Sequence, residues 1–345
     1  MHSEMTRRQE LAWIFAAVSA PVVMRCANLP WQWVLAACAF AALYYIIICI
    51  LRLLHGGERS LTELAQEAFG GVGGRMLLLL SAVWTLLAAA KAAEGSALAF
   101  PNGREAGLSG IVLLALAALA GRKGTGATAR CAAVLAPILA AMYALFLAAA
   151  APQLHTPWCA PWGTPKAGFA ALEAMLLPSA ALFLKRRPAE KRIPGVMLPI
   201  LVLAPPTFAL MTSGCLSPQV TAQEPLAFYT LSKSLHLFSF MQRFEPLVST
   251  MLYVGLFCMT ALLTQSGCAM LRPLIRAEHT DRWLPSAFCA AAFALSFVTS
   301  RLPQWIFDVA PTVFWGIFPL LTLLVVYAKK VRKKAKKRVD KPNLL

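Results

Sequence analysis

Charged side chains are scarce in this sequence, acidic ones above all. Asp, Glu, Lys and Arg make up 14% of the 345 residues, and only 15 residues are acidic. A soluble domain normally carries about 25% charged residues. Hydrophobic residues reach 59%, and the mean hydropathy is +0.65. This composition excludes an ordinary soluble domain and indicates an integral membrane protein.

Catalytic and metal-binding motifs are missing as well. The chain has no HExxH, no Walker A sequence and no GxSxG, and its five histidines do not pair at ligand spacing. The nine cysteines form neither CxxC nor a Cys/His cluster, and most lie in apolar runs, which is typical of buried free thiols. We therefore expect no enzyme, no metal ion and no cofactor. Cys159 and Cys215 fall in predicted outer loops, so a disulfide between them stays open.

What the chain does have is long apolar runs. A membrane-spanning helix needs roughly 20 apolar residues, and in hydrocarbon every backbone polar group must be bonded internally, so each run is expected to be a helix. We predict an all-α integral membrane fold, with a single polytopic domain over 1–330 and a basic cytoplasmic tail over 331–345. About ten spans are expected, at 9–28, 31–53, 74–100, 107–121, 129–152, 166–185, 193–213, 245–271, 283–300 and 306–328.

The cations behind the net charge of +17 are distributed unevenly along the chain. If the N-terminus is cytoplasmic, 25 of the 32 Lys and Arg residues fall in inner loops and tails, and five fall in outer loops. This bias predicts ten spans with both termini in the cytoplasm and requires no nucleic acid partner. Nine of the inner cations lie between Lys329 and Lys341. This run is interpreted as an anchor on anionic lipid, with a docking site for a partner protein as the alternative.

Two loops carry helical patterns of their own. Ser60-Leu-Thr-Glu63 has the spacing of a capping box, followed by an apolar face up to Gly70, which predicts a short helix on the cytoplasmic face. The outer loop before the eighth span contains an amphipathic stretch that begins at Pro225. This stretch is either a lid over a site or a packed cap.

Prolines interrupt spans one and six at similar depths. Ser19-Ala20-Pro21 and Leu177-Pro178-Ser179 each lie about 12 residues into their span. Paired interrupted helices are the sequence pattern that points to a transporter-type site, where freed backbone groups and helix ends bind a small zwitterion. Prolines occur in several other spans too, so ordinary membrane prolines are the alternative.

Charged side chains at membrane depth are costly and usually functional. Glu173 lies in the first half of span six. Lys91 and Glu94 share a face of span three, so Lys91 either pairs with Glu94 or reaches Glu173. Arg25 is expected to extend to the membrane surface. The candidate ligand-binding residues are Ser19, Ala20, Pro21, Trp84, Lys91, Glu173, Leu177, Pro178, Thr250 and Tyr253.

Three stretches carry a family resemblance. Residues 228–245, FYTLSKSLHLFSFMQRFE, place a lysine-containing segment and a QRFE turn before the eighth span. The same resemblance is carried by residues 60–70, SLTELAQEAFG, and by the stretch 124–137 ahead of span five. Glu173 with Pro178 also fits the sixth span of that family. Together, over most of residues 31–330, the chain resembles the spore-germination permease family, the B subunits of nutrient germinant receptors.

The resemblance implies a fold and a function. Family members belong to the amino acid–polyamine–organocation superfamily and have two inverted five-helix repeats. They lie in the spore inner membrane with an A subunit and a lipoprotein C subunit, bind a germinant that is typically an amino acid, and start germination. The pocket would lie among spans one, three, six and eight.

Two further functions stay open. One is a secondary active amino-acid transporter. The other is a structural membrane subunit that binds no ligand, which is favoured by two departures from the family. The connection 25–30 between the first two spans is short, and the first proline break lacks glycine.

Overall fold

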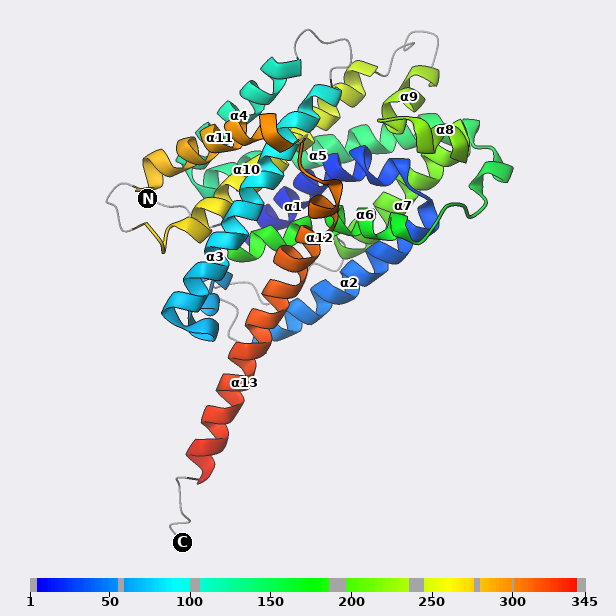
Figure 1. The fold of residues 1–345 in the computed structure, drawn as a ribbon. Coiled ribbons are helices and arrows are strands. Elements are labelled where there is room, and N and C mark those ends of the chain that lie inside the picture. Colours follow the sequence, from blue (N-terminus) through cyan, green and yellow to red (C-terminus); the bar gives the residue numbers. More distant parts are fainter. Residues whose placement is uncertain are drawn as a thin grey trace.

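The computed structural model describes residues 5–54, 59–99, 106–185, 197–235, 245–275, 280–299 and 301–339. Within these ranges the chain is almost entirely helical and contains no β-strand. Figure 1 shows the helices packed side by side in a bundle, from which the last helix extends. The prediction of an all-α membrane protein is confirmed at this level.

The long helices follow the predicted segments in order. They are α1 (Arg7–Met24), α2 (Trp31–Leu54), α3 (Leu61–Gly95), α4 (Ala106–Lys123), α5 (Thr125–Ala150), α6 (Lys166–Leu176), α7 (Met197–Leu216), α10 (Glu245–Leu271), α11 (Thr280–Thr299), α12 (Gln304–Pro311) and α13 (Phe318–Val339). Two short helices, α8 (Pro218–Gln223) and α9 (Ala227–Ser234), lie between α7 and α10.

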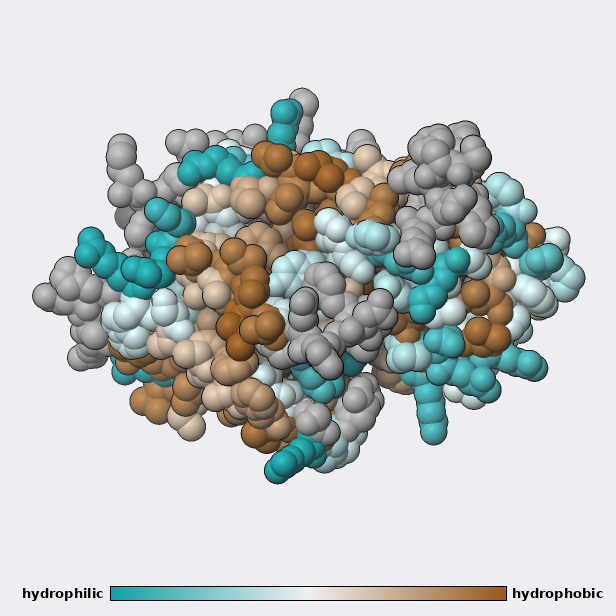
Figure 2. Space-filling model, turned by 90° about the horizontal axis from the view of Figure 1, so that it is seen from above, coloured by the Kyte–Doolittle hydropathy of each residue, from teal (hydrophilic) through white to brown (hydrophobic). Residues whose placement is uncertain are grey.

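Among the described residues, eight helical stretches are long and apolar enough to cross a membrane. The two predicted segments outside this set correspond to α4 and to α7, whose described apolar stretch Val202–Leu216 is shorter. Large apolar side chains are exposed on the outside of the bundle, for example Phe40 and Phe297, at 58% and 66% exposure. Figure 2 shows apolar patches of this kind on one face, as expected where lipid covers the surface. The count of ten spans and the inverted repeat stay predictions.

The interruption of span six is present, but that of span one is not. The α-helix of span six ends at Leu176 and continues as a 3₁₀-helix over Leu177–Phe183, at the predicted proline. In span one, however, α1 runs through Pro21 to Met24, followed by a 3₁₀ turn over Cys26–Asn28. The predicted interruption of helix 1 is wrong: Pro21 lies inside a continuous α-helix, as do Pro137 in α5 and Pro285 in α11, so the alternative of an ordinary membrane proline holds here.

The short helix predicted from the capping box is present. Ser60 caps it, with its side chain accepting a hydrogen bond from the amide of Glu63. The structure joins this helix to span three as the first part of α3, which bends at Gly70, where φ is 78°. A positive φ favours glycine, so this residue separates the surface helix from the span.

The start of the basic run on the last helix contacts the first part of α3 and the end of α2. Lys329 Nζ donates to the carbonyls of Glu67 and Ala68, at 2.9 and 2.8 Å, and Lys330 Nζ donates to the carbonyl of Leu54, at 2.8 Å. A cation at a helix C-terminus stabilises its last carbonyls. The α-helix then continues to Val339, beyond the predicted end of the span at residue 328.

A Lys329→Met substitution tests this contact. We expect the amides of residues 65–69 to exchange roughly 2- to 5-fold faster, because a charged cap contributes about 0.3–1 kcal/mol. Hydrogen exchange by mass spectrometry measures the change, and Lys123→Met, at the exposed end of α4, is the matched control. Equal protection in both variants would show that the lysine does not stabilise the helix end.

The amphipathic stretch of the outer loop forms α9, which packs onto the bundle. Phe228 is fully buried and its ring stacks on Phe146, with centroids 4.0 Å apart. Asn28, just after α1, donates to the carbonyl of Glu224 at 2.7 Å and accepts from the amide of Ala227 at 3.1 Å. In this conformation α9 is a packed cap, linked directly to the end of α1.

Candidate functional site

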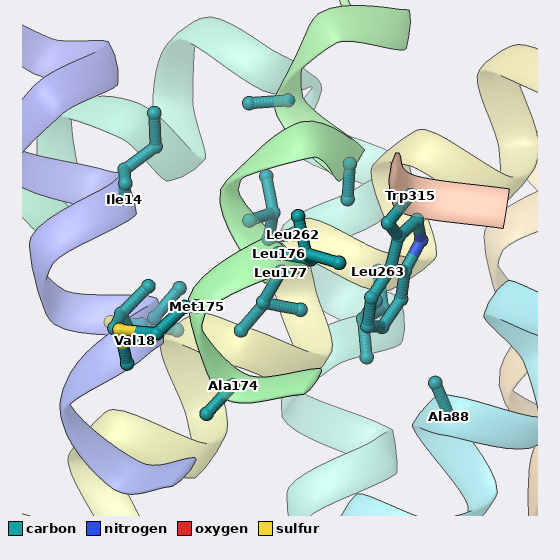
Figure 3. Close-up of a cluster of buried hydrophobic side chains, with 14 of the residues drawn as sticks. Ile14, Val18, Ala88, Ala174, Met175, Leu176, Leu177, Leu262, Leu263 and Trp315 are labelled. Atoms are coloured by element: carbon teal, nitrogen blue, oxygen red, sulfur yellow. The ribbon is translucent and has the colours of Figure 1, made fainter. Parts of the chain in front are cut away.

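A cavity of about 490 Å³ lies between α1, α3, α6, α10 and the tenth predicted segment, which contributes Phe307 of α12 and Trp315. This volume is within the range of small-molecule sites. Figure 3 labels four of its apolar lining residues, Ala88 on α3, Ala174 and Leu177 on segment six, and Trp315. The charged lining residues are Arg25, Lys91, Glu94 and Glu173. Their formal charges sum to zero, so the cavity suits a neutral or zwitterionic ligand.

The first charged pair joins spans one and six. Arg25 is the C-cap residue of α1, and its guanidinium forms an ion pair with the carboxylate of Glu173 on α6. The two side chains are 25% and 16% exposed, so water reaches them but does not surround them. The C-terminus of α1 favours the cation there. The expectation that Arg25 extends to the membrane surface is therefore wrong, because a carboxylate lies within its reach.

The second pair lies within α3. Lys91 Nζ is 3.1 Å from Glu94 Oε2, which also accepts a hydrogen bond from Thr299 Oγ1 at 3.0 Å. The ammonium of Lys91 lies 5.4 Å from the ring centroid of Phe307, a cation–π distance. Of the two partners considered for Lys91, the structure has Glu94, and Glu173 pairs with Arg25 instead.

Aromatic rings form the apolar wall. Trp315 and Phe307 line the cavity, and Trp84 packs behind them, with ring centroids 5.5 Å and 6.1 Å away. Trp315 lies in a π-helix over Thr312–Ile317, a form often found at functional sites. The hydroxyl of Tyr44 donates to the carbonyls of Trp315 and Gly316, at 2.8 and 3.0 Å, and so holds this segment in place.

The structure brings together four of the ten predicted site residues. Pro21, Lys91, Glu173 and Leu177 line the cavity. The remaining six, Ser19, Ala20, Trp84, Pro178, Thr250 and Tyr253, lie outside its lining.

Several of these six have clear structural roles. The carbonyl of Ser19 accepts from Tyr143 at 3.1 Å, beside a separate apolar cavity of about 200 Å³ on another side of α1. Thr250 is exposed and its hydroxyl donates to the carbonyl of Pro246 at 2.7 Å. The hydroxyl of Tyr253 donates to the carbonyl of Ser109 at 3.0 Å. Their polar groups are used within helices or between them rather than in the cavity.

Sequence reasoning did not assign Arg25, Phe307 and Trp315 to the site. Arg25 had one usable signal, a cation at the edge of a span. The two aromatic residues had none, since aromatic residues are common in membrane helices. Among the described residues, no group of three or more His, Cys, Asp or Glu side chains is placed to hold a metal ion.

The geometry changes the chemistry expected of the site. Because α1 is not unwound at Pro21, backbone groups freed in span one are not the recognition elements. The charged groups that α1 and α6 bring to the cavity wall are the guanidinium of Arg25 and the carboxylate of Glu173, which are in direct contact. No protein-family model and no curated protein sequence matches this chain.

Proposed function

We propose that this chain is the membrane subunit of a spore nutrient-germinant receptor, which binds a small nutrient such as an amino acid and triggers germination. The observation that carries the proposal is the cavity bridged by Arg25 and Glu173. It lies between spans one, three, six and eight, where the resemblance to the spore-germination permeases expects a pocket.

The two charges suit the two ends of an amino acid. The carboxylate of the ligand would pair with Arg25, whose guanidinium offers two parallel donors. The ammonium of the ligand would pair with Glu173, and an apolar side chain would lie against Leu177, Phe307 and Trp315. Each protein charge exchanges one partner for another, so no charge is left unpaired when the ligand binds.

Such an exchange provides a signal. Without ligand, the ion pair joins α1 directly to α6. With ligand, the two helices are joined through the zwitterion and lie further apart at this point. A ligand that favours the separated arrangement shifts the population of two conformations, and the A subunit and the lipoprotein C subunit are the proposed partners that receive the change. The proposed location is the spore inner membrane, with both termini and the basic tail on the cytoplasmic, anionic-lipid side.

A secondary active amino-acid transporter is the second candidate. The observation that favours it is the change from α- to 3₁₀-helix at Leu177 beside the cavity, since interrupted helices accompany transport sites. A transporter moves a labelled amino acid into vesicles containing only this chain, whereas a receptor subunit binds it without flux.

The experiment for the receptor function uses spores that lack this chain. We expect them to lose the response to at least one nutrient, and the wild-type chain supplied in trans to restore it. Unchanged germination on every nutrient, in spores shown to lack the protein, would reject the function. Flux in vesicles with normal germination would favour the transporter. Absence of both activities, with no ligand bound, would favour the structural subunit.

A further inference from the structure

The outer loop 151–165 is held firmly between the ends of two spans. The indole of Trp31, at the start of α2, donates to the carbonyl of Cys159 at 2.9 Å. The amide of His155 donates to the carbonyl of Gly214, near the end of α7, at 2.9 Å. Gly163, with φ of 74°, packs against Pro30 so closely that a Cβ would lie 2.5 Å from the proline ring. The backbone on both sides of Cys159 is therefore fixed relative to α7.

Two cysteines lie beside this contact. Cys159 ends the 3₁₀ turn Thr156–Cys159, and Cys215 lies in the last turn of α7; both are reduced and partly exposed. The Sγ of Cys159 lies 3.1 Å from where a Cβ on Gly214 would be, the residue before Cys215. Each thiol donates a weak bond to a carbonyl of its surroundings, Cys159 to His155 at 3.6 Å and Cys215 to Ala150 at 3.5 Å. These bonds are easily exchanged.

The remaining cysteines among the described residues differ in setting. Cys26, Cys38, Cys258, Cys268 and Cys289 are buried inside spans. Cys131 is exposed on α5, and Cys49 is partly exposed within α2. A disulfide needs two thiols within about 4–7 Å Cα separation and access to an oxidant. Cys159 and Cys215 combine partial exposure with a backbone hydrogen bond, from His155 to Gly214, that holds their two segments together.

We propose that Cys159 and Cys215 are a disulfide-forming pair that covalently fastens the outer loop 151–165 to the end of α7. The oxidant is a disulfide, either of a dithiol oxidoreductase or of a small thiol. One cysteine thiolate attacks it and releases a thiolate, and the second cysteine then attacks the mixed disulfide and releases the other thiol. Two electrons and two protons pass to the oxidant, and one S–S bond replaces another.

The bond acts on the outer half of the bundle. It closes a loop with 55 residues between positions 159 and 215, which restricts the unfolded chain strongly. In the folded protein the disulfide joins the loop 151–165 to α7. The chain continues from α7 through α8 to α9, the cap whose preceding residues Asn28 fastens to the end of α1. The oxidised form is therefore expected to be stiffer around the outer end of α1. This proposal does not depend on the ligand or on germination.

Counting thiols tests the pair directly. The purified chain is incubated with oxidised glutathione, denatured, and alkylated with a maleimide reagent of large mass. We expect seven reactive cysteines in place of the nine present after dithiothreitol, and a peptide linking Cys159 to Cys215 in a non-reduced digest. Nine reactive thiols in the oxidised sample, or a linkage of either cysteine to a different one, would overturn the proposal.

Serine variants extend the test to stability. In the wild type, oxidation is expected to raise the melting temperature by at least about 3 °C. In Cys159→Ser and in Cys215→Ser this rise is lost while the reduced proteins melt alike. Cys131→Ser is the matched control and keeps the full rise. A rise that persists in the Cys159 and Cys215 variants would contradict the assignment.

Discussion

Replacing Glu173 by glutamine is expected to raise the nutrient concentration needed for germination by at least about 30-fold. The substitution leaves Arg25 without its carboxylate partner and removes the group that would bind the ligand's ammonium. Truncating one member of a desolvated charge pair costs about 2–5 kcal/mol, and about 2 kcal/mol corresponds to the 30-fold shift. The measurement is germination of spores carrying the variant at wild-type protein level. Unchanged curves for every nutrient would refute the site.

Two further variants separate binding from folding. Glu63→Gln removes one negative charge from the exposed face of the first part of α3, so it is the matched control and keeps the wild-type response. The double variant Arg25→Glu, Glu173→Arg restores an ion pair with the charges exchanged. We expect it to recover thermal stability relative to either single change but not the nutrient response, because the cation and the carboxylate now face the wrong ends of the ligand.

Replacing Gly255 by alanine adds only one methyl group but is expected to lower the free energy of unfolding by about 1–3 kcal/mol. Gly255 on α10 crosses α1, and a Cβ there would lie 2.6 Å from Ser19 Oγ and 3.0 Å from both the Cβ and the backbone nitrogen of Ala20. A backbone atom cannot rotate away, so the two helices must separate next to the cavity. Overpacking typically costs about 1–3 kcal/mol. We expect a melting temperature several degrees lower and weaker ligand binding.

Gly71→Ala is the matched control for this prediction. Gly255 lies in the interior of α10, and Gly71 directly follows the bend at Gly70. Alanine has a higher helix propensity than glycine, by up to about 1 kcal/mol in a helix interior, so propensity disfavours neither substitution. A Cβ at Gly71 meets no atom within 4 Å. The same substitution is therefore expected to be neutral or stabilising in α3 and destabilising in α10. Equal melting temperatures for the two variants would show that the close crossing of α1 and α10 is not a constraint.

Much of this fold was predictable because its signals are local. The lengths of the apolar runs predicted the helical segments, and the spacing of Ser60 and Glu63 predicted the start of the capped helix. Pro178 located the change of helix type in span six. Pro21 gave the same signal and a different outcome, because α1 accommodates its proline without a break. Membrane helices tolerate proline where other groups satisfy the freed carbonyl, and such tertiary partners cannot be inferred from the sequence pattern.

The site was less predictable because its pairings are tertiary. Lys91 and Glu94 lie on one turn, so their pairing could be anticipated from spacing alone. Arg25 and Glu173 are far apart in sequence, and nothing local indicates that the end of α1 lies against α6. The π-helix that presents Trp315 depends on the carbonyl contacts of Tyr44, from a different segment again.

Calorimetric titration of the purified chain tests the central claim most directly. The ligands are the amino acid that triggers germination, the amine without its carboxylate and the carboxylic acid without its ammonium. Recognition by Arg25 and Glu173 predicts that the zwitterion binds and that each analogue binds at least about 30-fold more weakly, since each leaves one protein charge without a ligand partner. Equal binding of all three compounds, or of the zwitterion to the Glu173→Gln variant, would contradict the account.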